Sequence, residues 1–569
     1  MDARYRTLRH RAAALLTRIL LGATLLPGVG LGAGTAAARP VVVLTGTTFS
    51  AGLGLGVATD PLGLQQALWA PLVLFDDHLR PTAGLAASVP TLANKGVQVK
   101  GGGMTVTIRL KPDLRFSDGS PLTSSDVAFG LRINLDTALG NSFGLDEIAH
   151  YATPDKNTVV LQFHDLYGAY LAYALPPALP RSYFVRKYHS ADIHTLALAY
   201  RHDPYDSPSD VFSGPYRVGG LAPGQRLTLT PNPYDTALGA PGTRPELRYT
   251  VLSSDEGALA RDLHARNAGV DVALGFGPAA LPSLHGLAGG LRERTLPSLA
   301  VEHLELNQST PALKALGVRQ ALQLAIDKRA LVQSLFPATA NPARYVATSL
   351  IPSSSPYHDN SSAVSLYDPT RARRLLAAAG YATRLTGPGR HATLTLVTTN
   401  DPTRQREADL IARDWAAIGV RATPRLVSAS PADQGGLYAP YDRGGVLATR
   451  SFDVALFDLR LGPDPATVAS LFDPDRSPEP LRQGALRRNY TGIAVDALAM
   501  LPEAAQASLD FASRKRGYAK VQKEVNTLLP YIVLYERPRI VVDDGRVANF
   551  SPAPQDGGDL WNVWEWTRR

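Results

Sequence analysis

The chain has 569 residues, of which 45% are hydrophobic and 19% charged, and it contains no cysteine. One hydrophobic core rarely grows beyond about 250 residues, so this length predicts at least two lobes. The composition is typical of a soluble globular protein and excludes a disordered chain. Without cysteine, disulfides, thiolate metal sites, cysteine nucleophiles and a lipid anchor through cysteine are excluded as well.

The formal net charge is +8, and half of it lies in the first 38 residues. This segment carries five arginines and one aspartate, then the apolar run Ile19–Val29 and the small residues Ala36-Ala37-Ala38. We therefore predict residues 1–38 as a secretory signal peptide with cleavage before Arg39. An uncleaved membrane anchor is the alternative, although a spanning helix needs about 20 uninterrupted apolar residues. The rest of the chain is nearly balanced in charge, which excludes nucleic acid as a partner.

The first half of the chain is rich in short alternating segments. Val97–Lys100 and Met104–Leu110, separated by three glycines, predict a β-hairpin. Thr123 is placed to cap a helix that begins after it, with Asp126 at the positive end of the helix dipole. A second hairpin is predicted over residues 215–230 around Pro223-Gly224.

The second half alternates strands with helices. An N-cap, a proline and a final glycine predict a helix over Asp368–Gly380. Residues 392–399 are a predicted strand, 404–418 a helix and 420–427 a strand, which implies a parallel pair with a crossover helix. Phe452–Phe457 predicts one strand and Tyr531–Val542 predicts two. The fold class is therefore α/β with antiparallel additions, in two lobes.

Catalytic motifs are weak. Gly140-Asn141-Ser142-Phe143-Gly144 matches G-x-S-x-G, but the predicted helix over residues 127–139 stands where that motif needs a strand. The histidines between His189 and His202 do not have metal-ligand spacing, and we predict them to lie on the surface. The tryptophans near the C-terminus are predicted to dock that tail on the core, with a carbohydrate platform as the alternative. We expect a binding protein without catalytic residues, metal or cofactor.

Several blocks, in order, resemble family 5 of the extracellular solute-binding proteins of ABC importers, which includes dipeptide, oligopeptide and nickel binders. The longest block is MTVTIRLKPDLRFSDGSPLTSSD at Met104–Asp126. The other blocks are Ser213–Tyr216 with Asn232-Pro233-Tyr234, Val318-Arg319-Gln320-Ala321 with Ala325-Ile326-Asp327, Tyr367–Gly380, and Phe452-Asp453 with Asp464-Pro465. Together they extend over about residues 65–545, and they identify the scaffold rather than the ligand.

The resemblance implies a two-lobed, type II periplasmic-binding-protein-like clamp with an enlarged first lobe. On that basis we place lobe 1 at 39–252 plus 536–569, with an extra subdomain at about 65–200, and lobe 2 at 253–535. Ligand bound between the lobes would stabilise the closed form, which docks on a membrane permease. The implied protein is an exported, periplasmic or extracytoplasmic monomer that delivers peptides to ABC permease subunits.

The resemblance also suggests site residues. Peptide-binding members carry an Asp three residues before the Asp-Pro pair, and Leu461 stands at that position here. Asp458 offers a carboxylate from a shifted position, and Arg460 offers a guanidinium that can bind a carboxylate with two hydrogen bonds. The remaining candidates are Leu459 beside them, Thr48, Phe49 and Ser50 in the first cleft loop, and Trp69 on a following helix.

Alternatives remain open at this point. The same scaffold suits a receptor for a nickel chelate, a sugar or another solute. A sensor or chaperone would bind peptides without transporting them. A secreted hydrolase that uses Ser142 is the alternative from the enzyme class.

Overall fold

The computed structural model describes residues 41–46, 63–139, 143–252, 256–266, 269–277, 280–287, 290–337, 341–361, 366–386, 388–472 and 488–569. Residue contacts divide the chain into two compact units, Met1–Arg39 and Pro40–Arg569. The predicted signal peptide falls outside the described residues, so its cleavage stays a prediction. None of the helices in the described ranges has both the length and the apolar character that a membrane span needs.

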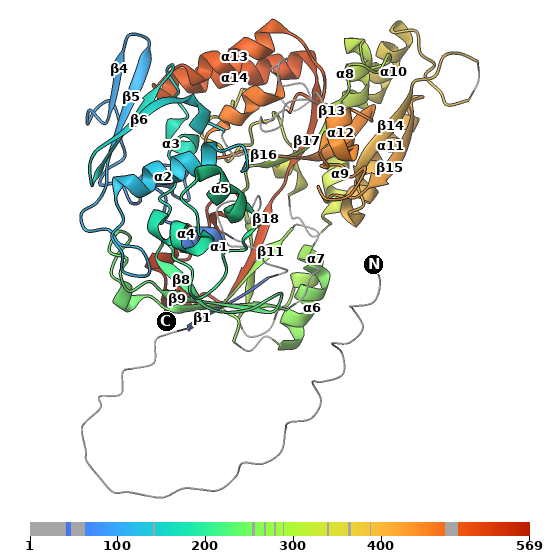
Figure 1. Cartoon of the computed structure of the whole chain (residues 1–569). Coiled ribbons are helices and arrows are strands. Elements are labelled where there is room, and N and C mark those ends of the chain that lie inside the picture. The colour runs from blue at the N-terminus through green and yellow to red at the C-terminus, as the bar shows by residue number, and fades with distance from the viewer. Residues whose placement is uncertain are drawn as a thin grey trace, which may run out of the picture. The chain divides into compact units, whose positions relative to one another are not determined.

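The first main sheet has seven strands that come from three distant parts of the chain (Figure 1). The central strand β1 runs parallel to its neighbours β10 and β11, and the other pairs are antiparallel. The antiparallel pairing of β8 with β9 confirms the hairpin predicted around Pro223-Gly224. In spatial order the strands are β12 (Arg292–Leu296), β18 (Arg539–Asp543), β11 (Val272–Phe276), β1 (Val41–Gly46), β10 (Glu246–Val251), β9 (Arg226–Pro231) and β8 (Tyr216–Ala222).

The second main sheet has five strands. In spatial order they are β15 (Arg421–Val427), β14 (Thr393–Thr399), β16 (Val454–Arg460), β13 (Ala300–Leu306) and β17 (Tyr531–Glu536). β14 is parallel to β15 and is joined to it by helix α11 (Pro402–Ala416), which confirms the predicted strand–helix–strand unit. β14 is also parallel to β16, so the carboxyl ends of both strands lie at one edge of the sheet.

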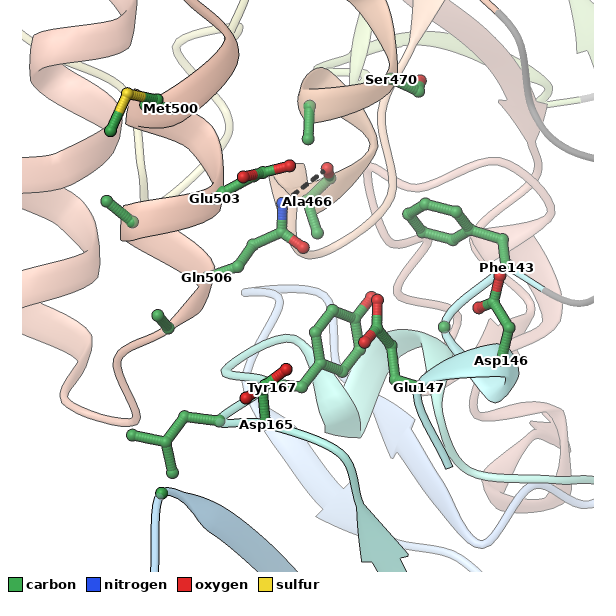
Figure 2. A pocket seen from close by; sticks show the side chains of 16 residues that line it. Phe143, Asp146, Glu147, Asp165, Tyr167, Ala466, Ser470, Met500, Glu503 and Gln506 are labelled. Carbon is green, nitrogen blue, oxygen red and sulfur yellow. Dashed lines mark hydrogen bonds between the residues drawn. The ribbon is translucent and has the colours of Figure 1, made fainter. Parts of the chain in front are cut away.

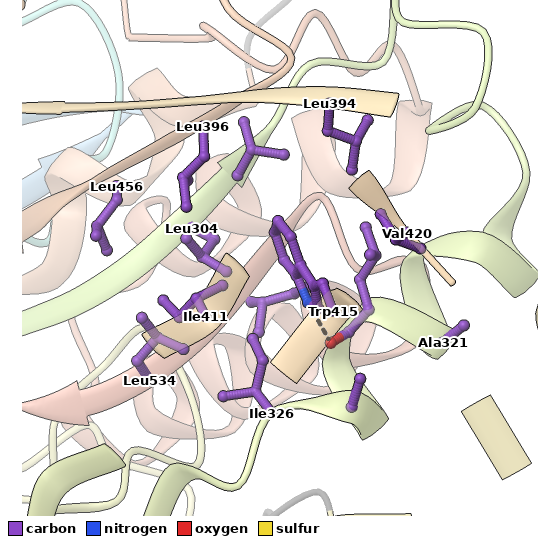
Figure 3. Close-up of a cluster of buried hydrophobic side chains, with 14 of the residues drawn as sticks. Leu304, Ala321, Ile326, Leu394, Leu396, Ile411, Trp415, Val420, Leu456 and Leu534 are labelled. Carbon is purple, nitrogen blue, oxygen red and sulfur yellow. Dashed lines mark hydrogen bonds between the residues drawn. The ribbon is translucent and has the colours of Figure 1, made fainter. Parts of the chain in front are cut away.

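The helix α11 packs on this sheet through one apolar face. Ile411, Trp415 and Ile418 have no measurable exposure, and they lie among side chains of β13, β14 and β16 (Figure 3). The Trp415 Nε1–H donates a hydrogen bond of 3.0 Å to the carbonyl oxygen of Leu322, so the indole is buried with its polar atom satisfied. Gly419 at φ 92° allows the chain to turn out of the helix into β15.

The chain passes between the two main sheets twice. Residues 297–299 join β12 to β13, and Arg537-Pro538 join β17 to β18. The two connections touch, because the Ser298 hydroxyl donates a hydrogen bond to the carbonyl oxygen of Arg537.

A four-stranded antiparallel sheet forms a smaller unit within the first half of the chain. Its order is β4 (Val97–Lys100), β5 (Gly103–Arg109), β7 (Thr158–Phe163) and β6 (Ile148–Asp155), which confirms the first predicted hairpin. Helix α2 (Ser124–Leu135) packs on it and begins as predicted. The backbone N–H and the hydroxyl of Thr123 both donate to the Asp126 carboxylate at 2.9 Å, which completes a capping box.

The remaining named helices and strand pairs complete the packing. The Asp368 carboxylate accepts a hydrogen bond from the Arg371 N–H, as predicted for an N-cap. The helices are α1 (Leu64–Leu68), α3 (Tyr170–Tyr173), α4 (Arg181–Tyr188), α5 (Ile193–His202), α6 (Glu256–Arg266), α7 (Leu281–Leu284), α8 (Leu316–Ala325), α9 (Lys328–Leu335), α10 (Pro369–Ala378), α12 (Val446–Thr449), α13 (Asp496–Gln506) and α14 (Phe511–Leu528). The short strand pairs are β2 (Val73–Phe75) with β3 (Pro81–Ala83), and β19 (Val547–Ala548) with β20 (Thr567–Arg568).

The C-terminal tail docks on the core as its tryptophans predict. Trp566 is fully buried in the cluster beside the seven-stranded sheet, and Trp564 is partly buried against it. The indole N–H of Trp566 donates to the Asn562 side-chain oxygen at 3.0 Å.

Strand pairing bears on the predicted lobe limits. The sequence-based boundary at residue 252 assigned β11 and β12 to lobe 2, whereas both strands lie in the seven-stranded sheet with β1 and β10. By hydrogen bonding, the segment up to Leu296 belongs with the first main sheet. The lobe limits as a whole stay a prediction.

Candidate functional site

Charged side chains gather at the edge of the five-stranded sheet where β14 and β16 end. Successive side chains of β16 point to opposite faces of the sheet, so Val454, Leu456 and Asp458 share one face. Val454 and Leu456 are buried in the core, and Asp458 follows them near the end of the strand. Asp458 pairs in register with Glu302 of the neighbouring antiparallel strand β13. Two carboxylates directly opposite each other repel, so this arrangement requires cations close by.

Three guanidinium groups supply these cations. Arg404, in the first turn of α11, donates from Nε to Glu302 at 3.0 Å and from a terminal nitrogen to Asp458. Arg537, in one of the two connections between the sheets, also donates to Glu302. Arg460 donates from Nε to Asp458 at 2.5 Å. We call these five residues, together with Asp556, the charge cluster.

The cluster reaches solvent through one ion pair. Arg460 holds the carboxylate of Asp556, from the C-terminal segment, at 3.2 Å. Their side chains are 52% and 51% exposed, whereas those of Asp458 and Glu302 are 7% and 0% exposed. The outer pair therefore meets water, and the inner groups hold Arg460 in place.

Burial and charge shift the pKa values in this cluster in opposite directions. Burial alone would raise the pKa of Asp458, but Arg537, Arg460 and Arg404 outweigh it and hold the pKa well below its ordinary range. Glu407, one turn after Arg404 and fully buried, has its pKa raised well above the ordinary value by burial and then by Glu302. Asp458 is therefore a permanent anion, and Glu407 retains its proton to higher pH.

An aromatic side chain lies beside the cluster. Tyr438, in the segment between β15 and α12, is 39% exposed and its ring centroid is 6.1 Å from that of Phe457. Burial raises the pKa of Tyr438 to about 12, which Arg404 partly offsets, so its hydroxyl is neutral and can donate a hydrogen bond. The site thus offers a guanidinium, a carboxylate and a phenol at its exposed end.

The structure places the candidate residues from the sequence in different environments. Asp458 and Arg460 come together in the cluster. Leu459 and Leu461 are 6% and 4% exposed and belong to a neighbouring hydrophobic cluster. Trp69 is 4% exposed and packs on two aromatic rings, so the structure accounts for it as a core residue. Thr48, Phe49, Ser50 and Ser142 lie outside the described residues.

Sequence reasoning missed most of the cluster. Nothing in the local sequence marks Glu302, Arg404, Arg537 or Asp556, because each becomes significant only through tertiary pairing. One signal was available: ligands of α/β proteins bind at the carboxyl ends of parallel strands, and the predicted β14–α11 unit puts Arg404 at that edge.

The other candidates from the sequence have structural explanations. His189, His194 and His202 are exposed, as predicted, and His194 lies 2.9 Å from the Asp136 carboxylate. In the described part of the chain, Asp76, Asp77 and His78 could bring three ligand atoms within 4.8 Å of one another. The Asp76 carboxylate already accepts hydrogen bonds from backbone N–H groups of its own turn, so the turn itself explains it.

Two α/β sheets linked by two connections have the architecture of a two-lobed clamp. The model for the bacterial extracellular solute-binding proteins, family 5, matches residues 87–478. The chain belongs to this family, and the predicted fold class is confirmed. The family serves as the substrate-binding component of ABC importers, which is a transport role.

Individual relatives agree with this assignment. A putative ABC transporter peptide-binding protein of Brucella melitensis is 26% identical over 508 residues, covering 87% of this chain and 88% of the relative. The oligopeptide-binding protein of Thermus thermophilus in complex with a pentapeptide has a TM-score of 0.69 at 19% identity, covering 93% of this chain and 96% of that one. NikZ of Campylobacter jejuni in complex with Ni(L-His) has a TM-score of 0.72 at 18% identity, covering 93% and 100%.

Proposed function

We propose that this exported protein captures peptides between its two lobes and delivers them to the permease of an ABC importer. The observation that carries the proposal is the half-exposed pair of Arg460 and Asp556 at 3.2 Å. A peptide with free termini carries one carboxylate and one ammonium group, which are the counterions of these two side chains. The Brucella relative and the pentapeptide-bound neighbour support the same ligand class.

Replacing this pair with ligand contacts is energetically feasible. An exposed ion pair contributes only about 0–1 kcal/mol, whereas a bidentate guanidinium–carboxylate contact inside a closed site is stronger. The hydrogen bond from Arg460 Nε to the buried Asp458 carboxylate orients the guanidinium, which is therefore already positioned before ligand arrives. Bridging waters can satisfy the rest of the ligand, which favours tolerance of peptide sequence.

The role needs no covalent chemistry. Ligand binding stabilises a closed arrangement of the lobes by its differential affinity, with residues 297–299 and 537–538 as the hinge. We include in the proposal that the protein is a monomer, has no enzymatic activity and carries no cysteine-linked lipid, since the chain has no cysteine.

Mass spectrometry of small molecules that co-purify with the mature protein, followed by thermal shift against a peptide library, tests the proposal. A ligand at 100 times its dissociation constant adds about 2.7 kcal/mol of stability, which a melting curve detects. Shifts with peptides are the expected result. A shift with another solute and with no peptide would remove the peptide assignment.

Deletion of the protein separates transport from sensing. Uptake of a labelled peptide should fall in the deletion strain and return when the gene is restored. Unchanged uptake by a protein that binds peptides in vitro would indicate a sensor or a chaperone instead.

A further inference from the structure

A cavity of about 650 Å³ shares no lining residue with the charge cluster. Its walls come from residues 143–167 beside the small sheet, with Gly102, and from residues 466–470 and 500–507, about 300 residues further along the chain, the latter including part of α13. Figure 2 shows Glu147 and Tyr167 from the first stretch and Glu503 from the second extending toward the space between them. We call this cavity the acidic pocket.

The charge of the lining is one-sided. Four carboxylates line the pocket, those of Asp146, Glu147, Asp165 and Glu503, and its described lining contains no lysine, arginine or histidine. Phe143 and Met500, whose side chain is 66% exposed, add apolar surface to the lining. The lining therefore suits a ligand with several positive charges and apolar spacers.

A buried hydroxyl points to a ligand independently of these carboxylates. Tyr167 is 4% exposed, and its hydroxyl has no hydrogen-bond partner among the described residues. Burial, and then the surrounding acidic groups, raise the pKa of Tyr167, so the hydroxyl stays neutral. A buried hydroxyl without a partner is unfavourable, and its oxygen can accept a hydrogen bond from an ammonium group.

The pocket is held open by contacts between its two walls. Across the two walls, the Gly168 N–H donates to the carbonyl oxygen of Gln506 at 2.6 Å. Within the second wall, the Gln506 side-chain amide donates to the carbonyl oxygen of Ala466 at 3.3 Å (Figure 2). The Tyr173 hydroxyl donates to the carbonyl oxygen of Asp464 at 2.5 Å. A ligand would enter a preformed site, at a low ordering cost.

We propose that the acidic pocket binds a linear polyamine, with its ammonium groups on the carboxylates and on Tyr167 and its methylene segments on Phe143 and Met500. Direct coordination of a single metal ion is not favoured. Within the described residues, the group that brings three ligand atoms within 4.8 Å of one another is Asp76, Asp77 and His78, outside this pocket. The proposal assigns a second ligand to the protein beyond the peptide.

Titration of the mature chain with spermidine, by calorimetry in about 0.15 M salt, tests the site. We expect saturable binding that Glu503→Gln weakens roughly tenfold or more, because one charged hydrogen bond is lost. Tyr167→Phe should weaken spermidine binding without lowering the melting temperature of the free protein. Asp442→Asn, at an exposed carboxylate that does not line the pocket, is the matched control and should change nothing.

Further probes make the test decisive. Butylamine should bind much more weakly than spermidine, and Mg²⁺ should not compete at equal concentration. The proposal would be overturned if Mg²⁺ bound the pocket as tightly as spermidine does. It would also be overturned if Glu503→Gln bound spermidine as tightly as the parent protein does. Peptide binding should be unaffected by Glu503→Gln, so the failure of one site is distinguishable from the failure of the other.

Discussion

At the residue scale, the ionisation of Glu407, which is buried beside the charge cluster, makes the stability of the protein depend on pH. Tyr535 donates a hydrogen bond to one of its oxygens at 3.1 Å, and the other oxygen has no hydrogen-bond partner among the described residues. Because burial raises its pKa above the ordinary 4.5, the folded state binds more protons than the unfolded state above that pH. The free energy of unfolding therefore falls as pH rises through this window.

Glu407→Gln removes that dependence because the amide has no proton to lose. We expect the variant to match the parent protein near pH 4 and to be more stable by roughly 1–3 kcal/mol at pH 8, as measured by urea unfolding. Asp442→Asn is the control for loss of a surface carboxylate. Destabilisation of Glu407→Gln at pH 8 would show instead that Glu407 is ionised and needed as an anion beside Arg404 and Arg537.

Arg460 tests the ligand contact itself. Arg460→Gln should weaken binding of a peptide with a free carboxyl terminus roughly 10- to 100-fold, since one charged hydrogen-bonded contact is lost. The matched control is Arg248→Gln, which breaks a similarly exposed pair with Glu246 at 2.8 Å on the seven-stranded sheet. A C-terminally amidated peptide should lose little further affinity on Arg460→Gln. Equal losses for both peptides would place the ligand carboxylate elsewhere.

How much of the site the sequence predicts depends on how far apart the interacting residues lie along the chain. Asp458 and Arg460 are two residues apart on one strand, so their proximity follows from local geometry. Arg404, Glu302 and Asp556 reach the same point from three other segments, and that convergence depends on strand register and on the path of the tail. No periodicity carries such information.

At the element scale, the start of α11 couples stability to the site. The Asp401 carboxylate accepts a hydrogen bond of 2.9 Å from the Arg404 N–H, so one N-cap fixes the turn that carries the central guanidinium. Asp401→Ala should cost about 1 kcal/mol in unfolding experiments and should also weaken peptide binding. Asp401→Asn retains a capping oxygen and should be close to the parent protein in both measurements. Equal behaviour of the two variants would contradict the role of the cap.

The elements that the sequence predicts share strong local signals. Each of these signals lies within a few neighbouring residues. They are the capping box of Thr123 and Asp126, the N-cap Asp368 before Pro369, and the alternating pattern of the hairpin at residues 97–110. β12 lacks such a signal, because its sequence RERTL is charged and forms an edge strand, exposed on one side. The sequence therefore predicts no strand there.

At the scale of the whole molecule, the proposed closure places its hinge at the two connections between the main sheets. If residues 297–299 and 537–538 act as the hinge, saturating peptide should lower the radius of gyration in small-angle X-ray scattering. Arg460→Gln should show the same decrease once enough peptide is added to saturate it. Saturated binding without any change in dimensions would contradict ligand-driven closure.

Isothermal titration calorimetry of the mature protein tests the central claim most directly. A short peptide with free termini should bind one to one, with a negative heat-capacity change because closure buries apolar surface. The same peptide acetylated at its amino terminus and amidated at its carboxyl terminus should bind at least about 100-fold more weakly, since two charged contacts of about 1.5–3 kcal/mol each are lost. Failure of every peptide to bind, together with clear binding of a nickel–histidine complex or a sugar, would contradict the account.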